Sequence, residues 1–199
     1  MGPESCGARR LWALRGAYQD PKLIWRTEGL RARVGWVYLV RVATDEEVEI
    51  LRAIADYQFG LGVGATVIPD RPLLRVSRRT GRVRAVVDPE EGVLFTVRAS
   101  TYTLIPTILG AVRLRRALPF PRLRCVVVNE VADEVVARRS TVFSRHVLLV
   151  DESLRPGDEV LVVDESDRLL CVGTLKLSPT EVMEFIRGAA IRVRACING

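Results

Sequence analysis

The last third of the chain is a series of short apolar runs separated by turn residues. The runs have the length of buried β-strands, and they lie at 124–128, 147–150, 159–163, 169–177 and 190–197. Between two of them, Arg155-Pro156-Gly157-Asp158 supplies the fixed and permissive φ values of a tight turn. Five or more short strands, with a helix near each end and no long loop, predict a small mixed β-barrel.

The end of this segment carries two further signals. Ser178 and Glu181 have the spacing of a capping box, and Gly188 is placed to end the helix that follows. The final run alternates arginine with apolar residues. Arg192 and Arg194 are therefore expected on one face of a strand, opposite Ile191, Val193 and Ala195.

The middle of the chain predicts a compact α+β domain. Thr44 and Glu47 form a second capping box ahead of apolar residues at helical spacing, and Gly60 lies near the end of that helix of about four turns. An antiparallel meander is expected next, with strands at 73–77, 82–87 and 93–98 and a fourth at 101–105. A helix over 106–118, with proline in its first turn, and the stiff linker 119–121 complete the segment.

Composition sets outer bounds. The chain has 199 residues, is 48% apolar and has no apolar run of transmembrane length, so we expect a cytoplasmic protein that does not enter a membrane. The four cysteines form no CxxC pair and there is one histidine, His146, which predicts no metal site. Three cysteines lie in apolar runs and are interpreted as buried and reduced. A disulfide such as Cys125 with Cys171 stays open if the source is a hyperthermophile.

The net charge of +6 is concentrated near the N-terminus. Residues 1–43 carry eight Lys or Arg against three Asp or Glu, whereas the last 78 residues are close to neutral. All but two of the basic residues are arginine, which suits bidentate phosphate contacts and stacking on bases. A GC-rich genome explains the same bias without any function.

Several motifs in one sequence order resemble a known pair of domains. Val142-Phe143-Ser144-Arg145-His146-Val147, the run 155–164 and the run 187–194 resemble a PUA domain, the RNA-binding barrel named after pseudouridine synthases and archaeosine transglycosylases. The runs 51–60, 77–84 and 97–99 resemble the domain immediately before it in archaeal tRNA-guanine transglycosylase and archaeosine synthase. The resemblance covers about residues 45–197 and includes none of the catalytic parts of those enzymes.

We therefore predict an α+β fold with three segments. Residues 1–43 are a basic extension containing tryptophan and arginine, residues 44–118 are the pre-PUA domain of one helix plus a meander, and residues 122–197 are the PUA-type mixed β-barrel. In the extension, Trp12, Trp25 and Trp36 lie among arginines, as in segments that stack on bases. The alternatives are an added strand, for which Trp36, Tyr38 and Val40 alternate correctly, and a start codon assigned too far upstream.

The resemblance implies that the tail holds tRNA, with the PUA domain at the acceptor-stem end and 3′ terminus. Carried over by position, the RNA-binding candidates on this domain are Arg138, Arg139, Ser140, Phe143, Arg145, Arg192 and Arg194. Arg139 stands where the family usually has glycine. A phenylalanine in an apolar strand such as Phe143 is more often part of the core, and an arginine stripe is often only a solvated face.

A second group of candidates surrounds the predicted hairpin of the middle domain. Arginines there could track phosphates or protect a strand edge by charge, and the RNA-binding candidates are Arg78, Arg79, Arg82 and Arg84, with Arg75 beside them. Asp56, Tyr57 and Gln58 near the helix end are interpreted as structural, because no histidine or second carboxylate lies nearby in sequence.

The function predicted from the sequence is non-catalytic RNA binding, with no catalytic residues and no cofactor. The expected partner is tRNA, and the chain would act as a detached tail or accessory subunit of archaeosine modification, together with a transglycosylase catalytic subunit. Two alternatives stay open: a ribosome-assembly factor that binds pre-ribosomal RNA, and a protein-interaction module whose arginines meet an acidic partner.

Overall fold

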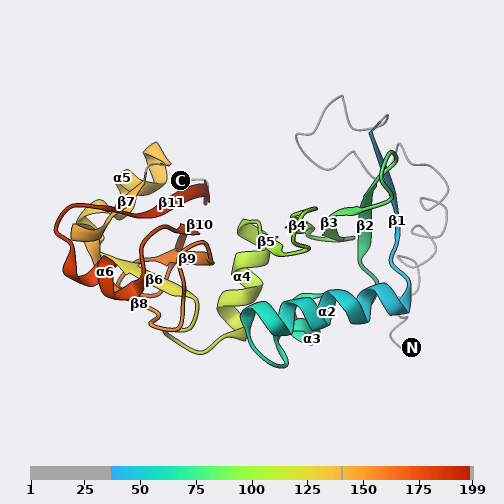
Figure 1. Cartoon of the computed structure of the whole chain (residues 1–199), viewed down its shortest axis with the longest axis horizontal. Helices are drawn as coiled ribbons and strands as arrows, with labels where there is room; N and C mark the ends of the chain where they lie inside the picture. Colours follow the sequence, from blue (N-terminus) through green and yellow to red (C-terminus); the bar gives the residue numbers. More distant parts are fainter. Residues whose placement is uncertain (1–36, 140, 198–199) are drawn as a thin grey trace, which may run out of the picture.

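Two β-sheets, one in each half of the chain, organise the computed structural model (Figure 1). The structure describes residues 37–139 and 141–197. The first sheet contains five strands and the second contains six, and helix α4 leads from one to the other. The predicted α+β class, with a helix-covered meander followed by a mixed barrel, is confirmed.

The first sheet is an antiparallel meander in sequence order. Its strands are β1 (Tyr38–Val42), β2 (Leu73–Ser77), β3 (Val83–Asp88), β4 (Gly92–Val97) and β5 (Leu104–Pro106). The three central strands lie where the alternating pattern predicts them. The fourth predicted strand is shorter than expected and begins at Leu104. The strand alternative for Trp36, Tyr38 and Val40 is confirmed in the described part, since Tyr38 pairs with Ser77 in β1; Trp12, Trp25 and Trp36 lie outside the described residues.

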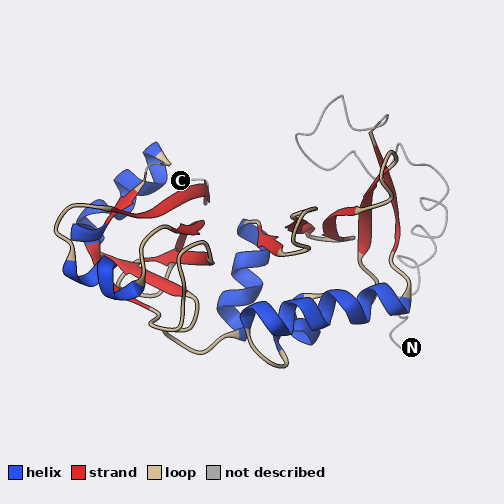
Figure 2. Cartoon of the chain, in the orientation of Figure 1, coloured by secondary structure: helices blue, strands red, loops and turns tan. Residues whose placement is uncertain are grey.

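Helices cover one face of this sheet (Figure 2). Helix α2 (Asp45–Phe59) begins with the predicted capping box: Thr44 Oγ1 accepts from the Glu47 amide at 3.2 Å, and Glu47 Oε2 accepts from the Thr44 amide at 3.0 Å. Gly60, with φ of 130°, ends the helix. The buried side of α2 presents Val48, Leu51, Ala55 and Phe59 to the core.

Helices α3 (Val63–Val67) and α4 (Ile108–Ala117) complete this layer. Helix α4 begins later than predicted because Thr107 caps it, while Pro106 still pairs with Phe95 as the last residue of β5. Gly110 allows α4 to touch the sheet, since a Cβ atom there would lie 2.2 Å from the Leu94 carbonyl oxygen.

The second sheet curls into a nearly closed mixed barrel. Its strands are β6 (Arg124–Val127), β7 (Val142–Phe143), β8 (Val147–Val150), β9 (Glu159–Val163), β10 (Leu169–Leu175) and β11 (Ala189–Cys196), in the order β7-β11-β10-β9-β6-β8. Only the β6–β9 pair is parallel among these described strands. The 3-10 turn η1 (Ser144–His146) connects the two outer strands, and α5 (Asn129–Arg138) packs near β10.

Helix α6 (Pro179–Glu184) has the predicted capping box, in which Ser178 Oγ accepts from the Glu181 amide at 3.3 Å. The prediction that Gly188 ends this helix is wrong. The helix ends at Glu184, with Phe185 as its cap, and Gly188 lies in the connection to β11. There its carbonyl accepts a hydrogen bond of 3.0 Å from the Ser144 amide, so the glycine joins the connection to η1 instead of ending the helix.

The structure corrects the interpretation of the cysteines as reduced. Cys171 and Cys196 face each other on β10 and β11 and form a disulfide with an S–S distance of 2.05 Å. The pair that the sequence left open, Cys125 with Cys171, does not form. Cys125 is free and buried as expected, and burial raises the pKa of its thiol to about 12. Spacing could not reveal the disulfide, because only the register of β10 against β11 brings these thiols together.

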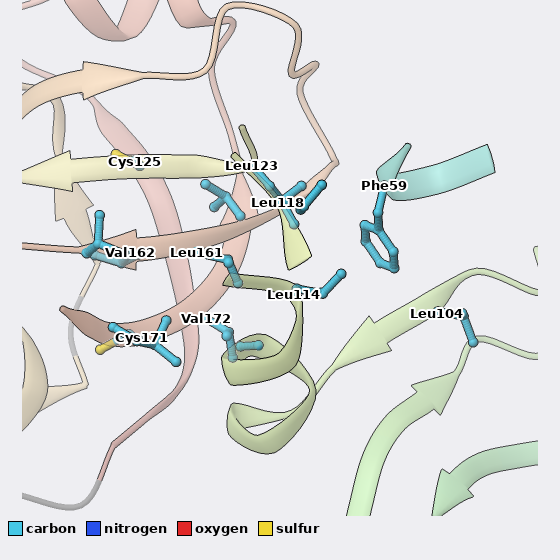
Figure 3. Packing of buried hydrophobic residues seen from close by; sticks show 14 of the residues in the cluster. Phe59, Leu104, Leu114, Leu118, Leu123, Cys125, Leu161, Val162, Cys171 and Val172 are labelled. Carbon is cyan, nitrogen blue, oxygen red and sulfur yellow. The ribbon is translucent and has the colours of Figure 1, made fainter. Parts of the chain in front are cut away.

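One hydrophobic core runs through both domains. Leu114 of α4 points toward Phe59 of α2 (Figure 3), and Leu118, which caps α4, belongs to the same cluster as Leu123 and Leu161 of the second domain. The connection between the domains is thus packed on both sides, and this arrangement fixes where surface residues of one domain lie relative to the other.

Arg124 holds this connection from inside, with a side chain only 2% exposed. Its Nε donates to Asp167 Oδ1 at 2.8 Å. The two Nη atoms donate to backbone oxygens of the α4 end and the linker, including Arg115 at 2.7 Å and Arg122 at 2.7 Å. These are carbonyls that a helix end and a turn leave without backbone partners, so Arg124 stabilises the junction by satisfying them.

Candidate nucleic-acid interface

The loop after α5 carries the first group of predicted RNA-binding residues. Arg138 forms an ion pair with Glu134 at 3.0 Å, one turn earlier on the same exposed helix face. Arg139 ends the helix in the left-handed conformation, with φ of 48° and ψ of 40°. Such a conformation favours glycine, the residue that the resemblance to a PUA domain leads us to expect at this position. Ser140 lies outside the described residues.

Phe143 and Arg145 form an exposed pair beside this loop. The expectation that Phe143 belongs to the core is wrong, because its side chain is 45% exposed on the two-residue strand β7. The Arg145 guanidinium carbon lies 5.9 Å from the centroid of the Phe143 ring. The Arg145 Nε also donates to His146 Nε2 at 2.9 Å. An aromatic ring with a cation beside it offers one surface for stacking and one for phosphate.

Arg192 and Arg194 project from β11 as the alternation predicts, and both are exposed. They help to line a cleft of about 650 Å³ between the two domains. On the barrel side the cleft is also lined by Gly157, Thr174, Lys176 and Val193; on the other side it is lined by Arg98 and Ile105. Four cationic side chains therefore line the cleft. Arg98 follows β4, Lys176 follows β10, and the other two lie on β11.

Glu159, at the start of β9, is the carboxylate beside these cations. Its side chain is 7% exposed. Its Oε2 accepts a hydrogen bond of 2.6 Å from Arg194 Nη2, and the same nitrogen donates to the Pro106 carbonyl across the domain boundary at 3.2 Å. Glu159 Oε1 lies 4.0 Å from Arg98 Nη2 and has no hydrogen-bond partner.

Sequence reasoning missed Arg98 and Lys176. Both were marked in the sequence, since Arg98 lies in the motif 97–99 that carries the resemblance and Lys176 is one of the two lysines of the chain. Neither signal placed these residues near β11. Only the packing of α4 against the barrel brings β4 and β5 to the side of β10 and β11.

The hairpin arginines lie in the first domain, at the opposite end of the molecule from β7 (Figure 1). Arg78 and Arg79 are exposed at the turn, whereas Arg84 is half-buried in β3. Arg82 Nη1 donates to the Ala99 carbonyl at 3.0 Å, which connects the hairpin to the loop that begins with Arg98. The structure thus does not bring this group together with Phe143 and Arg145.

The interpretation of Asp56 and Gln58 as structural agrees with their contacts. Asp56 Oδ1 accepts from the Gly64 amide at 2.6 Å, and Gln58 Oε1 accepts from the Leu104 amide at 2.7 Å. Over residues 37–139 and 141–197 no cluster of His, Cys, Asp and Glu has a metal-binding arrangement. Among the helices of the same residues, none is long and apolar enough to cross a membrane.

Two protein families match the two domains in the predicted order. Residues 49–121 match the patch-forming domain C2 of tRNA-guanine transglycosylase, and residues 124–197 match the PUA domain. The first match covers β2 to β5, α3, α4 and all but the start of α2, and the second covers the barrel.

Curated archaeal relatives match both domains together. The tRNA-guanine(15) transglycosylase of Methanocaldococcus jannaschii is 40% identical over 144 residues, which are 72% of this chain and 22% of the relative. That of Thermococcus kodakarensis is 40% identical over 149 residues, 75% of this chain and 25% of the relative. The chain thus spans about a quarter or less of the length of these curated relatives.

Solved structures share the fold. A hypothetical protein from Pyrococcus horikoshii aligns with a TM-score of 0.63 at 19% identity, over 79% of this chain and 94% of that one. A conserved PUA domain protein from Thermoplasma acidophilum aligns with a TM-score of 0.53 at 18% identity, over 79% and 93%. Because fold, order of domains and archaeal relatives agree, the chain is a PUA-domain protein that resembles the C-terminal region of archaeal tRNA-guanine transglycosylase, its C2 domain followed by its PUA domain.

Proposed function

We propose that this chain binds tRNA without catalysing a reaction on it, as an accessory subunit of archaeosine modification. The observation that carries the proposal is the exposed pair of Phe143 and Arg145 on the PUA domain, with ring centroid and guanidinium carbon 5.9 Å apart. Protein-bound RNA commonly presents unstacked bases at loops and ends, and these stack on aromatic rings while arginine meets the phosphate. The neighbouring Arg138 and Arg139 add positive charge at the loop after α5.

The accessory role rests on how the chain compares with its relatives. Enzymes named tRNA-guanine(15) transglycosylase contain the two matched domains within chains four to five times longer than the matched segment. In this proposal, a separate chain supplies the catalytic centre and the present chain supplies the hold on tRNA. The domains 44–118 and 122–197 then act as one tRNA-binding unit, with residues 1–43 as a basic extension in the cytoplasm.

The binding proposal is tested by titrating a labelled tRNA transcript with purified protein at physiological salt and measuring fluorescence anisotropy. Phe143→Ala should weaken binding about tenfold, because stacking of one base on an aromatic ring contributes roughly 1–3 kcal/mol. Tyr57→Ala is the matched control, since it removes another exposed aromatic ring, from α2 of the first domain, and it should leave the affinity unchanged. Binding no tighter than that of an equally basic unrelated protein would refute the proposal.

The identity of the RNA and the existence of the partner need a second experiment. Crosslinking in extract of the source cells, followed by sequencing of the recovered RNA, should enrich tRNA acceptor ends. A tagged copy should also co-purify with a transglycosylase catalytic chain. Recovery of ribosomal RNA instead would indicate the ribosome-assembly alternative, and a complex without RNA would indicate a protein-interaction module.

A further inference from the structure

The cleft between the domains has the features of a binding site that neither domain contains alone. One side is formed by Arg98 and Ile105, and the other by residues of β10, β11 and the turn before β9. Its volume of about 650 Å³ lies in the range of sites that enclose part of a ligand. Any ligand there would contact both domains at once.

Positive charge is concentrated in this cleft. Arg98, Lys176, Arg192 and Arg194 line it. Within the described residues, neither Lys176 nor Arg192 forms an ion pair, and Arg194 is held by Glu159 at 2.6 Å. Cations gathered in a concave surface without enough counter-charge attract anions strongly, because the low-dielectric walls focus the field.

Glu159 is the carboxylate nearest to these cations, and it leaves Arg98 only weakly paired. Its side chain is 93% buried, since 7% is exposed, yet its Oε1 has no hydrogen-bond donor. The nearest cation is Arg98, whose Nη2 lies 4.0 Å away, within the range of an ion pair but too far for a hydrogen bond. Arg98 is 46% exposed and therefore held only loosely by this carboxylate.

We propose that the cleft binds phosphates of the RNA backbone through Arg98, Lys176 and Arg192, and that Glu159 is the built-in counter-ion from which Arg98 is released when phosphate binds. This inference rests on the proposed function. Arginine suits the role because its planar guanidinium binds two phosphate oxygens at once. Glu159 keeps Arg194 in position through Oε2 while Oε1 competes with the RNA for Arg98.

The two roles of Glu159 predict different effects for two substitutions. Glu159→Gln keeps an oxygen for Arg194 and removes the negative charge, so Arg98 becomes free for phosphate and RNA binding tightens about three- to tenfold. Glu159→Ala also removes the acceptor that holds Arg194, so the cleft loses its arrangement and this variant binds RNA more weakly than the Gln variant. A purely structural role for Glu159 would weaken binding in both variants.

The measurement is an anisotropy titration with a fluorescent single-stranded ribo-oligonucleotide over a range of salt concentrations. In Glu159→Gln the affinity should rise while the slope of log affinity against log salt stays close to that of wild type, because Arg98 contacts the same phosphate in both proteins. Arg98→Ala should lower the slope by about 0.7, the value for one phosphate contact on a single strand, and abolish the gain from Glu159→Gln. Glu49→Gln removes a charge from an exposed position on α2 and is the matched control, with no change expected.

The inference is overturned if Glu159→Gln unfolds with wild-type cooperativity and binds RNA no tighter than wild type. If that variant does not fold, Arg98→Ala decides instead, and an unchanged affinity in this half-exposed substitution overturns it. Inorganic tripolyphosphate separates the inference from the proposed function. If tripolyphosphate displaces the labelled oligonucleotide only when Arg98 is present, and the same protein fails to bind tRNA, the phosphate site would be supported and the tRNA role refuted. Displacement of the labelled oligonucleotide by polyglutamate but not by tripolyphosphate would overturn the phosphate site.

Discussion

The arginine at the domain junction and those around the cleft have different surroundings. Arg124 is 2% exposed, and its three nitrogens donate to a carboxylate and to backbone carbonyls. Arg192 is exposed and forms no ion pair within the described residues. One arginine stabilises the arrangement of the domains and the other is available to a ligand. The arginine-rich composition therefore has no single cause, since the burial and the partners of each arginine differ.

Substitution of Arg124 should give the largest effect. Arg124→Ala leaves Asp167 and the carbonyls at the end of α4 without their donors inside a packed junction. Breaking a buried charged contact of this kind typically costs about 3–5 kcal/mol, so we expect a loss of that size in the free energy of unfolding, measured by urea denaturation. Arg192→Ala is the matched control and should change stability by less than about 0.5 kcal/mol. Equal effects of the two substitutions would show that Arg124 does not stabilise the junction more than an exposed arginine does.

Reduction of the disulfide tests how much the covalent bond between β10 and β11, the strands beside the cleft, adds to the free energy of unfolding. Cys171 and Cys196 join β10 to β11 across a sequence separation of 25 residues. Closing a loop of this size stabilises a fold by about 3 kcal/mol, because the cross-link lowers the conformational entropy of the unfolded chain. Urea denaturation with and without reductant should therefore differ by about that amount. The double variant Cys171→Ala/Cys196→Ala should be insensitive to reductant, because it lacks this disulfide. A wild type equally insensitive would contradict the prediction.

Local signals predicted local structure well. Both capping boxes, at Thr44 with Glu47 and at Ser178 with Glu181, begin the helices that they predict. The strand β2 has the predicted bounds, because alternation and flanking turns depend on neighbouring residues only. The start of α4 shows the limit of such signals, since Pro106 fits the first turn of a helix in sequence and pairs with Phe95 in the sheet.

The candidate site was less predictable because it depends on contacts between distant segments. Alternation placed Arg192 and Arg194 on the exposed face of β11, but it gave no reason to add Arg98, about a hundred positions earlier. Phe143 shows the converse error, since an apolar strand predicts burial and the short strand β7 leaves this ring exposed. Whether these residues contact RNA stays a prediction.

Arg139 is a third kind of arginine, whose backbone matters more than its side chain. Its φ of 48° is unfavourable for any residue with a Cβ atom. Arg139→Gly should therefore raise the free energy of unfolding by up to about 1 kcal/mol. Arg138→Gly is the matched control, because Arg138 is the last residue of α5 and glycine there should lower stability by up to about 1 kcal/mol. Urea denaturation of both variants measures the difference, and a destabilised Arg139→Gly would show that its side chain makes a contact that outweighs the strain.

The smallest effect is expected at the ion pair of Arg41 with Glu47. Arg41 is 38% exposed and has a partner, so it is less buried than Arg124 and better paired than Arg192. The Arg41 hydrogen bonds to Glu47, followed by those from Thr44, outweigh partial burial and lower the pKa of Glu47 from 4.5 to about 2. A carboxylate with a lowered folded pKa contributes stability that is fully present above pH 4.5 and is lost as the pH falls toward 2.

The difference in melting temperature between wild type and Glu47→Gln should therefore be largest above pH 4.5 and shrink steadily below it. Asp88, Asp151 and Asp164 also have a lowered pKa, because hydrogen bonds to each carboxylate outweigh the effect of burial, but they are present in both proteins and cancel in the difference. Raising the salt concentration should reduce the effect, since an exposed pair is screened by ions. A difference that stays constant from pH 6 to pH 2.5 would mean that the helix cap alone, and not the charge on Glu47, stabilises the start of α2.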